Sequence, residues 1–306
     1  MSRVLVTGAS GFIGSHVVAA LCSRGHEVEA FALDAGPDRE GVRWHQGDLF
    51  EPGAAERLLG ELQPELLVHL AWYATPGKFW SAPENEAWVG ATLALVRAFA
   101  GAGGRRAVLT GSCAEYAWGE ELLEESATAL EPATFYGACK RDAYLGSREL
   151  AAELGLPLAW GRVFFLYGPG EPPGRLVSDV ARGLLAGERV PTTSGRQRRD
   201  FMHVADVAGA LAALLESDVE GAVNIATGEP VEVREIVAAI AAEAGSGAVA
   251  AGDLPDRDGE PDVIAGDPRR LREEVGFCPS IALAEGIRET VAWHRDAAGK
   301  GVRGRR

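Results

Sequence analysis

Short apolar runs alternate with longer amphipathic segments over the first 110 residues of the chain. The apolar runs, rich in β-branched residues, predict strands at residues 3–6, 27–32, 42–45, 66–69 and 107–110. Between them, apolar positions recur at i, i+3, i+4 and i+7 and predict helices at residues 12–23, 52–62 and 83–100. Strands and helices that alternate in this way form a parallel sheet covered on both faces. We therefore expect an α/β fold, a doubly wound Rossmann sheet with right-handed crossovers.

The pattern continues to residue 164 and then changes. A helix at residues 134–154, ended by Gly155, and a buried strand at 158–164 complete the first part. Glycines and prolines cluster at residues 168–174 and predict a domain boundary. We expect a dinucleotide-binding Rossmann domain at residues 1–166, rejoined by parts of 196–226, and a smaller C-terminal substrate-binding lobe at 167–306. In this lobe the sequence predicts helices at 176–186, 206–215 and 233–244, a strand at 222–226, an irregular segment at 245–270 and a frayed tail at 299–306.

Composition excludes several classes of protein. The net charge of −14 argues against a general binder of nucleic acid, which needs excess cationic charge. The sequence shows neither a signal peptide nor the run of about 18 apolar residues expected of a membrane helix. The 4 cysteines form no CxxC pair and the 6 histidines no HExxH motif. We therefore predict a cytoplasmic protein without a metal site.

A glycine-rich turn follows the first predicted strand and opens the first predicted helix. Residues 7–14 read TGASGFIG, which places glycines at three-residue spacing. Such glycines allow a tight turn, close approach of backbone N–H groups to a pyrophosphate, and close contact of the helix with the sheet. In this strand–turn–helix context the motif predicts a dinucleotide site made by Gly8, Ser10, Gly11, Phe12, Ile13 and Gly14.

The choice of dinucleotide depends on the end of the second predicted strand. An acidic residue there favours NAD, because it can bond the 2′-hydroxyl of the adenosine ribose. Asp34 lies 20 residues beyond Gly14 and favours NAD, whereas Arg39 and Arg43 leave NADP possible as partners of a 2′-phosphate. Further cofactor contacts are expected from Asp48 and Leu49 after the third strand and from Leu70 and Ala71 after the fourth. A structural turn is the alternative role for Asp48.

Tyr136 and Lys140 lie four residues apart on one face of the predicted helix at 134–154. An ammonium beside a phenol lowers the phenol pKa from its ordinary value of about 10. Tyr136 would then serve as an acid and base near neutral pH. A YxxxK string is common by chance, so its weight comes from the motifs that accompany it.

Together, the glycine turn and the YxxxK pair resemble those of the extended short-chain dehydrogenase/reductases, specifically the nucleotide-sugar epimerase, dehydratase and ketoreductase group. The likeness runs from Val4 to about Pro279. Residues 109–116, LTGSCAEY, place Ser112 four residues before a tyrosine, as this family does, and the segments RVFFLYGPG at 162–170 and RDFMHVADV at 199–207 match further family motifs. The resemblance implies a catalytic triad of Ser112, Tyr136 and Lys140.

The resemblance also implies the ligands of the site. It implies NAD(P), contacted also by Phe164, and a nucleoside-diphosphate sugar whose pyrophosphate meets Arg199 and Arg257. Family members commonly carry an asparagine where this chain has Phe165, so other contacts must come from elsewhere, with Arg175 a candidate. The full set of expected substrate contacts is Tyr73, Ser112, Cys113, Phe165, Arg175, Arg199 and Arg257. The aromatic cluster of Trp72, Tyr73, Phe79 and Trp80 either covers the sugar or belongs to the core.

Departures from the family pattern narrow the chemistry. Family dehydratases carry a glutamate, and 3,5-epimerase/reductases a cysteine, at the position of Ala114. Cys113 and Glu115 are each displaced by one residue, which in an extended segment points a side chain to the opposite face. Hydride transfer at the hexose C4 remains, with Tyr136 exchanging the hydroxyl proton and Ser112 bonding the same oxygen.

Four functions are compatible with these residues. A 4-epimerase is slightly favoured over a reductase of 4-keto-6-deoxy sugars. Reduction of a small carbonyl compound without a nucleotide is the third, and a dinucleotide-sensing protein without turnover is the fourth. Family likeness further implies a homodimer formed through the helices near residues 83–100 and 134–154.

Overall fold

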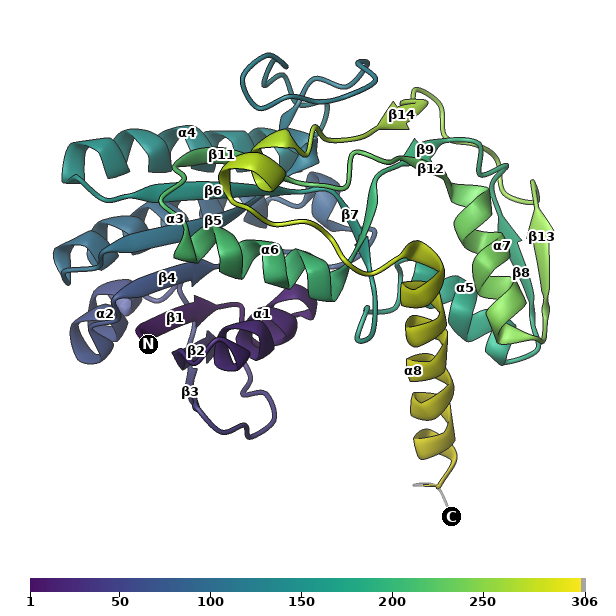
Figure 1. The fold of residues 1–306 in the computed structure, drawn as a ribbon, viewed down its shortest axis with the longest axis horizontal. Helices are drawn as coiled ribbons and strands as arrows, with labels where there is room; N and C mark the ends of the chain where they lie inside the picture. Colours follow the sequence, from purple (N-terminus) through teal and green to yellow (C-terminus); the bar gives the residue numbers. More distant parts are fainter. Residues whose placement is uncertain (304–306) are drawn as a thin grey trace.

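The computed structural model describes residues 1–303 and contains the predicted parallel sheet. Seven strands lie in the order β11-β6-β5-β4-β1-β2-β3, and every neighbouring pair is parallel (Figure 1). The strands are β1 (Arg3–Thr7), β2 (Glu27–Ala32), β3 (Val42–Gln46), β4 (Leu66–His69), β5 (Arg106–Ser112), β6 (Leu158–Val163) and β11 (Gly221–Ile225). The expected Rossmann fold is therefore confirmed.

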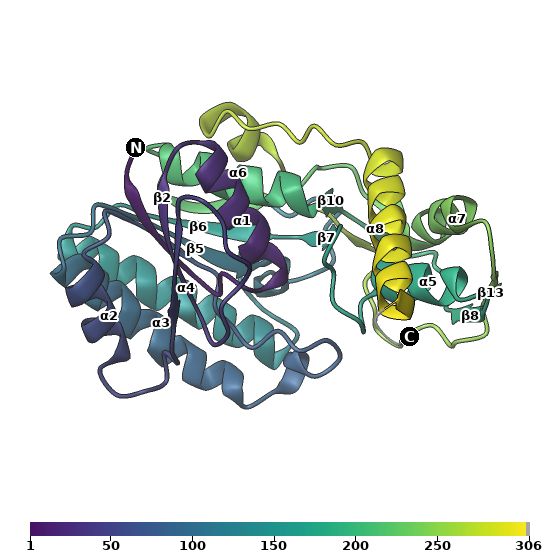
Figure 2. The same cartoon turned by 90° about the horizontal axis from the view of Figure 1, so that it is seen from below.

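Helices cover both faces of the sheet because alternate strand residues point to opposite sides. Val4 and Val6 of β1 join one core cluster with α1 (Phe12–Ser23) and α6 (Val204–Glu216). Leu5, between them, joins a second cluster on the other face. That face is covered by α2 (Ala54–Leu62), α3 (Glu84–Gly101) and α4 (Phe135–Leu154). Figure 2, turned by 90°, shows the two helical layers on either side of the strands.

The ends of α4 are set by local residues. Thr134 is its N-cap and accepts a hydrogen bond from the backbone N–H of Gly137 at 3.0 Å. Gly155 ends the helix in the left-handed region at φ 65°. Tyr136 and Lys140 consequently lie in the first two turns of α4, near the C-terminal end of β5.

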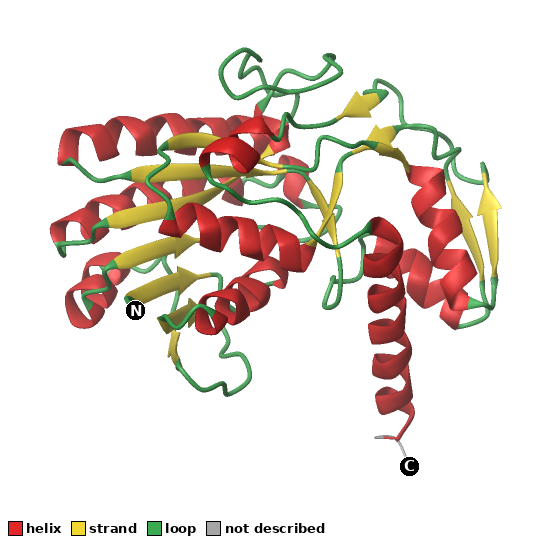
Figure 3. Ribbon diagram, in the orientation of Figure 1, coloured by secondary structure: helices red, strands yellow, loops and turns green. Residues whose placement is uncertain are grey.

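The C-terminal lobe combines three helices with small sheets (Figure 3). Its helices α5 (Leu176–Leu185), α7 (Val233–Ala244) and α8 (Leu283–Arg303) pack around a core that includes Tyr167, Ile240 and Ile287. The small sheets pair β7 (Phe165–Tyr167) with β10 (Phe201–His203), β8 (Arg189–Thr192) with β13 (Ala248–Ala251), and β9 (Arg198–Arg199) with both β12 (Val231–Glu232) and β14 (Val263–Ile264).

Two expectations for the C-terminal part were wrong. Residues 245–270 contain β13 and β14, which pair with strands more than 50 residues away, so no local pattern predicts them. The tail is helical to Arg303, as the end of α8, where we expected fraying from residue 299; residues 304–306 lie outside the described part. No helix within residues 1–303 is long and apolar enough to cross a membrane.

Candidate active site

The glycine turn forms a cradle between β1 and α1. Gly8 has φ +68°, and a Cβ there would lie 2.7 Å from the backbone nitrogen of Ala71. A Cβ on Gly14 would lie 2.1 Å from the carbonyl oxygen of Gly8. Within residues 1–303, no side chain caps the N-terminus of α1, and Ser10 and Gly11 are exposed. The cradle thus leaves backbone N–H groups and the positive end of a helix facing outward, which fits a dinucleotide pyrophosphate.

The end of β2 favours NAD. Asp34 is exposed two residues beyond the last residue of the strand, as expected. Arg43 lies on β3 and donates from Nε to the buried carboxylate of Glu29 at 3.0 Å, and His45 Nε2 bonds the same carboxylate at 2.7 Å. Burial alone raises the pKa of Glu29, but these hydrogen bonds lower it overall. Arg43 is therefore paired with Glu29 near the start of the edge strand β3, and its role at a 2′-phosphate stays an alternative prediction.

The remaining cofactor candidates contribute mainly backbone. Asp48 accepts a hydrogen bond from the N–H of Phe50 at 2.9 Å, which is the structural turn that we named as its alternative role. Leu49 is buried in the sheet core. Leu70 donates its N–H to the carbonyl oxygen of Thr7 at 3.2 Å, and the backbone of Ala71 lies against Gly8.

Ser112 and Tyr136 come together at the C-terminal end of β5. The Ser112 hydroxyl accepts from the N–H of Ala114 at 3.2 Å, and Ser112 lies close enough to the Tyr136 phenol to lower its pKa. Burial raises the pKa of Tyr136 above its usual value, and the nearby Ser112 hydroxyl and the charge of Arg175 offset only part of this. The predicted net lowering of this pKa is therefore wrong, because desolvation of the phenolate outweighs the nearby positive charge.

Lys140 lies beside β5 and an indole ring. Its ammonium donates to the carbonyl oxygen of Thr110 at 2.8 Å and lies 3.7 Å from the centre of the Trp72 ring. Burial lowers the pKa of Lys140 to about 7, against a smaller raising effect from Glu115. The lysine is thus anchored on the strand that carries Ser112.

The aromatic cluster divides into two parts. Phe79 and Trp80, in a short 3-10 turn (Phe79–Ser81), pack edge-on against Tyr136, with ring centres 4.9 and 5.9 Å from its ring. Trp72 instead stacks on Trp88 of α3, with ring centres 6.1 Å apart. The first pair covers the phenol, and Trp72 covers the lysine.

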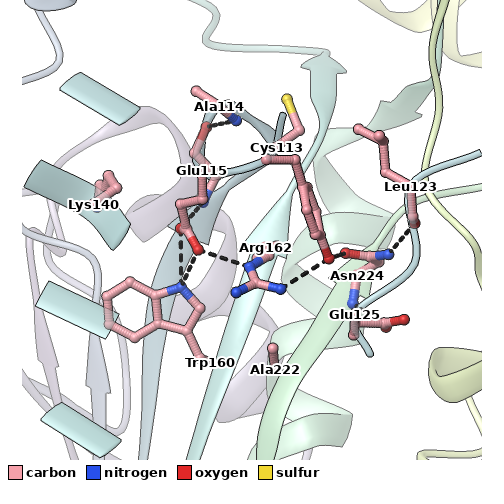
Figure 4. Close-up of polar contacts among 12 residues, drawn as sticks. Cys113, Ala114, Glu115, Leu123, Glu125, Lys140, Trp160, Arg162, Ala222 and Asn224 are labelled. Atoms are coloured by element: carbon pink, nitrogen blue, oxygen red, sulfur yellow. Dashed lines mark hydrogen bonds and ion pairs between the residues drawn. The ribbon is translucent and has the colours of Figure 1, made fainter. Parts of the chain in front are cut away.

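A buried ion pair joins Glu115 and Arg162 next to the C-terminal end of β5 (Figure 4). Glu115 is fully buried, and its carboxylate accepts from the Ser112 N–H at 2.7 Å, Trp160 Nε1 at 3.0 Å and Arg162 Nε at 2.7 Å. Arg162 also donates to the Tyr116 hydroxyl at 2.9 Å. Residues 113–115 form a 3-10 turn, η2 (Cys113–Glu115), instead of the extended segment that we assumed. Glu115 fixes the backbone of Ser112, and its charge also acts on Tyr136 and Lys140.

The side chains of Cys113 and Phe164 are core residues. Both are less than 9% exposed and pack in one apolar cluster with Tyr116. Burial raises the pKa of the Cys113 thiol to about 12, so the thiol is neutral. Any contact of these two residues with ligands would be made chiefly by the backbone.

The expected phosphate-binding arginines differ in their surroundings. Arg199 is 3% exposed, and its Nη2 donates to Glu260 at 2.7 Å, with its guanidinium 5.6 Å from the Phe165 ring centre. Arg175 is half-buried, its Nε has no hydrogen-bond partner within residues 1–303, and its charge acts on Tyr136. Arg257 is exposed on the loop before β14, while Tyr73 is half-buried after β4. Within the described residues, Arg175 therefore keeps a buried donor without a partner, whereas Arg199 is already paired.

A dinucleotide cradle beside a serine, a tyrosine and a lysine defines a Rossmann-fold oxidoreductase. The chain belongs to the NAD dependent epimerase/dehydratase family, whose model matches residues 4–226. The resemblance inferred from the motifs is thereby confirmed. The protein is an NAD-dependent enzyme of this family, and NAD is the expected cofactor.

Several relatives match most of the chain. A UDP-glucose 4-epimerase of Mycolicibacterium smegmatis is 32% identical over 96% of this chain and 99% of its own. The crystal structure of a Thermus thermophilus UDP-glucose 4-epimerase in complex with NAD is 31% identical, with a TM-score of 0.87 and coverage of 96% and 99%. A 3-diazoavenalumate denitrifying reductase of Streptomyces sp is 33% identical over 74% of this chain and 77% of its own. Epimerase and reductase names thus both occur among proteins similar to this one.

Sequence reasoning missed two features of the site. One is the contact of Trp72 with Lys140, which joins residues 68 positions apart. The other is the pair of Glu115 and Arg162. A signal for the pair was present, because Arg162 interrupts an otherwise apolar strand and a buried arginine requires a partner.

Proposed function

We propose that this chain is a nucleotide-sugar 4-epimerase. The observation that carries the proposal is that Ser112 and Tyr136 lie close together at the same C-terminal edge of the sheet that holds the glycine cradle. NAD, when bound, supplies reversible hydride transfer. Ala114 is buried and brings no acid or thiol to this edge, which argues against water elimination as a further step.

The proposed roles follow from the contacts of each side chain. Tyr136 removes the proton of the C4 hydroxyl and returns a proton when C4 is reduced on its other face. Ser112 hydrogen-bonds the same oxygen and holds it near the phenol. Lys140 is held beside β5 by the carbonyl oxygen of Thr110 and by Trp72, and Phe79 and Trp80 exclude water around the phenol.

Arg175 and Arg199 are the proposed partners of the substrate phosphates. Removing Arg175 by substitution with alanine should weaken binding of UDP about tenfold or more, because a charge-assisted hydrogen bond is worth about 1.5–3 kcal/mol. Arg199→Ala should weaken it less, since its guanidinium is already bonded to Glu260. Isothermal calorimetry with UDP measures both effects.

Arg105→Ala is the matched control, because this exposed arginine lies just before β5, at the opposite edge of the sheet, and pairs with Glu65. It should leave UDP affinity unchanged. If the wild-type protein binds no nucleoside diphosphate at all, the sugar-nucleotide substrate is wrong.

A reductase is the second candidate function. It is favoured by the similarity to the Streptomyces reductase and by the apolar pair of Phe165 and Phe201, whose ring centres are 5.6 Å apart. Phe165 replaces an amide side chain that is common in the family. The substrate site would therefore be less polar, which suits a 4-keto-6-deoxy sugar or a small carbonyl compound. Such a reductase consumes reduced cofactor in proportion to product, and absorbance at the reduced-nicotinamide band separates it from an epimerase.

We also propose the two-domain division and the homodimer. Residues 1–166 would bind the dinucleotide and 167–306 the substrate, with α6 and β11 returning to the first domain, as their packing on the sheet supports. The helices α3 and α4 lie side by side on one face and would form the dimer contact. Sedimentation velocity tests the dimer.

A further inference from the structure

Lys140 is a buried cation with few compensating contacts. It is 5% exposed and donates to the carbonyl oxygen of Thr110. An ammonium carries three donors, and desolvation favours its neutral form. Burial accordingly lowers its pKa to about 7. Near neutral pH its charge therefore depends on every favourable contact around it.

Two titratable groups face Lys140 from neighbouring elements. Glu115 of η2 attracts the ammonium, but its carboxylate is bonded to Arg162 and Trp160. His69 of β4 is buried and neutral, with burial and then the charge of Lys140 lowering its pKa to about 3. Its ring nitrogens bond the hydroxyls of Thr7 and Thr92. Neither group is free to form an ion pair with the lysine.

The indole of Trp72 lies directly against the ammonium. The nitrogen of Lys140 is 3.7 Å from the ring centre, well inside the range of about 6 Å for a cation–π contact. The ring cannot turn away, because its Nε1 donates to Asn85 Oδ1 at 2.8 Å and its plane stacks on Trp88 with an angle of 26°. Asn85 is fully buried, and its amide donates to the carbonyl oxygens of Phe79 and Ala82. The face of Trp72 is thus held toward the lysine.

We propose that Trp72 is a positioning residue that holds the side chain of Lys140 charged and in place beside β5. The electron-rich face of the indole attracts the ammonium where no free carboxylate does so. The consequence for turnover rests on the proposed function, but the effect on the lysine itself does not. Because Asn85 bonds both Trp72 and the turn that carries Phe79, it links the lysine contact to the cover over Tyr136.

The chain offers a direct test, because Lys78, Lys140 and Lys300 are its only lysines. Protein labelled with ¹³C at the lysine ε-carbon gives three signals, and the Lys140 signal is assigned by its loss in Lys140→Met. Its pH titration in the full chain should move down by about 1 pH unit in Trp72→Leu, because a desolvated cation–π contact is lost. Trp72→Phe, which keeps a weaker π face, should give a smaller decrease.

Trp293→Leu is the matched control, since Trp293 is an exposed tryptophan on α8 and should leave the Lys140 titration at its wild-type midpoint. If Trp72→Leu does not fold, Trp72→Phe and Asn85→Ala, which frees the indole, must each lower the midpoint. An unchanged midpoint in the folded Trp72 variants, or an equal decrease in Trp293→Leu, would overturn the proposal. If the enzyme has turnover, the alkaline limb of the pH profile of its turnover should shift to lower pH together with the midpoint of the Lys140 titration. Absence of turnover on sugar nucleotides would contradict the proposed function and leave the titration result standing.

Discussion

Replacing Tyr136 by phenylalanine is expected to lower kcat by a factor of about 10²–10⁴, the usual effect of losing a general acid or base. Phenylalanine keeps the ring that packs against Phe79 and Trp80, so the fold and the cover over the site should persist. Only the hydroxyl near Ser112 is lost. Steady-state kinetics with a UDP-hexose should therefore show a fall in kcat, with NAD binding and KM near their wild-type values.

Tyr144→Phe is the control for this substitution. Tyr144 lies two turns further along α4 and packs against Trp160, with ring centres 5.5 Å apart. It should leave kcat within a factor of about 3 of wild type, because its ring packing is retained. If Tyr136→Phe turns over as fast as the Tyr144 variant, the phenol has no chemical role, and a non-catalytic or differently catalysed function gains support.

Glu115→Gln is expected to destabilise the protein by about 3–5 kcal/mol, the usual cost of removing one partner of a buried ion pair. Arg162 is 1% exposed and would keep its charge without a carboxylate. The Ser112 N–H would also lose its charged acceptor. Urea unfolding measures the change as a lower transition midpoint at an unchanged slope.

The double substitution Glu115→Met with Arg162→Met separates charge from packing. Removing both charges together should recover most of the lost stability, because apolar residues of similar size can replace a buried pair. Glu285→Gln is the surface control, since this glutamate is 53% exposed and should change stability by less than about 0.5 kcal/mol. A loss below about 1 kcal/mol in Glu115→Gln would contradict the structural role assigned to the pair.

Local signals predicted the parts of the fold that position the cofactor and the catalytic residues. The glycine turn was predictable because close backbone contacts leave no room for a Cβ at Gly8 and Gly14. The same contacts occur where a strand is followed by a helix at a pyrophosphate site. The helix α4 was readable because Thr134 caps it and Gly155 ends it. Once both ends of α4 were predicted, Tyr136 and Lys140 could be placed in its first two turns.

Features that depend on distant partners were not predictable. The strand β13 forms only by pairing with β8, and its alanines carry no strand pattern of their own. The helix α8 is a different case, because it was missed although its core residues Leu283, Ile287 and Val291 repeat every four positions. The pKa of Tyr136 was predicted in the wrong direction because sequence spacing reports which charges are near but not how much water is excluded.

The fate of deuterium at C4 tests the proposed chemistry most directly. The protein is incubated with a UDP-hexose deuterated at C4, together with NAD and without added reduced cofactor. The account predicts a 4-epimer that retains deuterium at C4 and no net change in absorbance at the reduced-nicotinamide band, because the hydride that leaves C4 returns to C4. Loss of the label from the product to solvent would contradict the account. So would the absence of any product unless reduced cofactor is added.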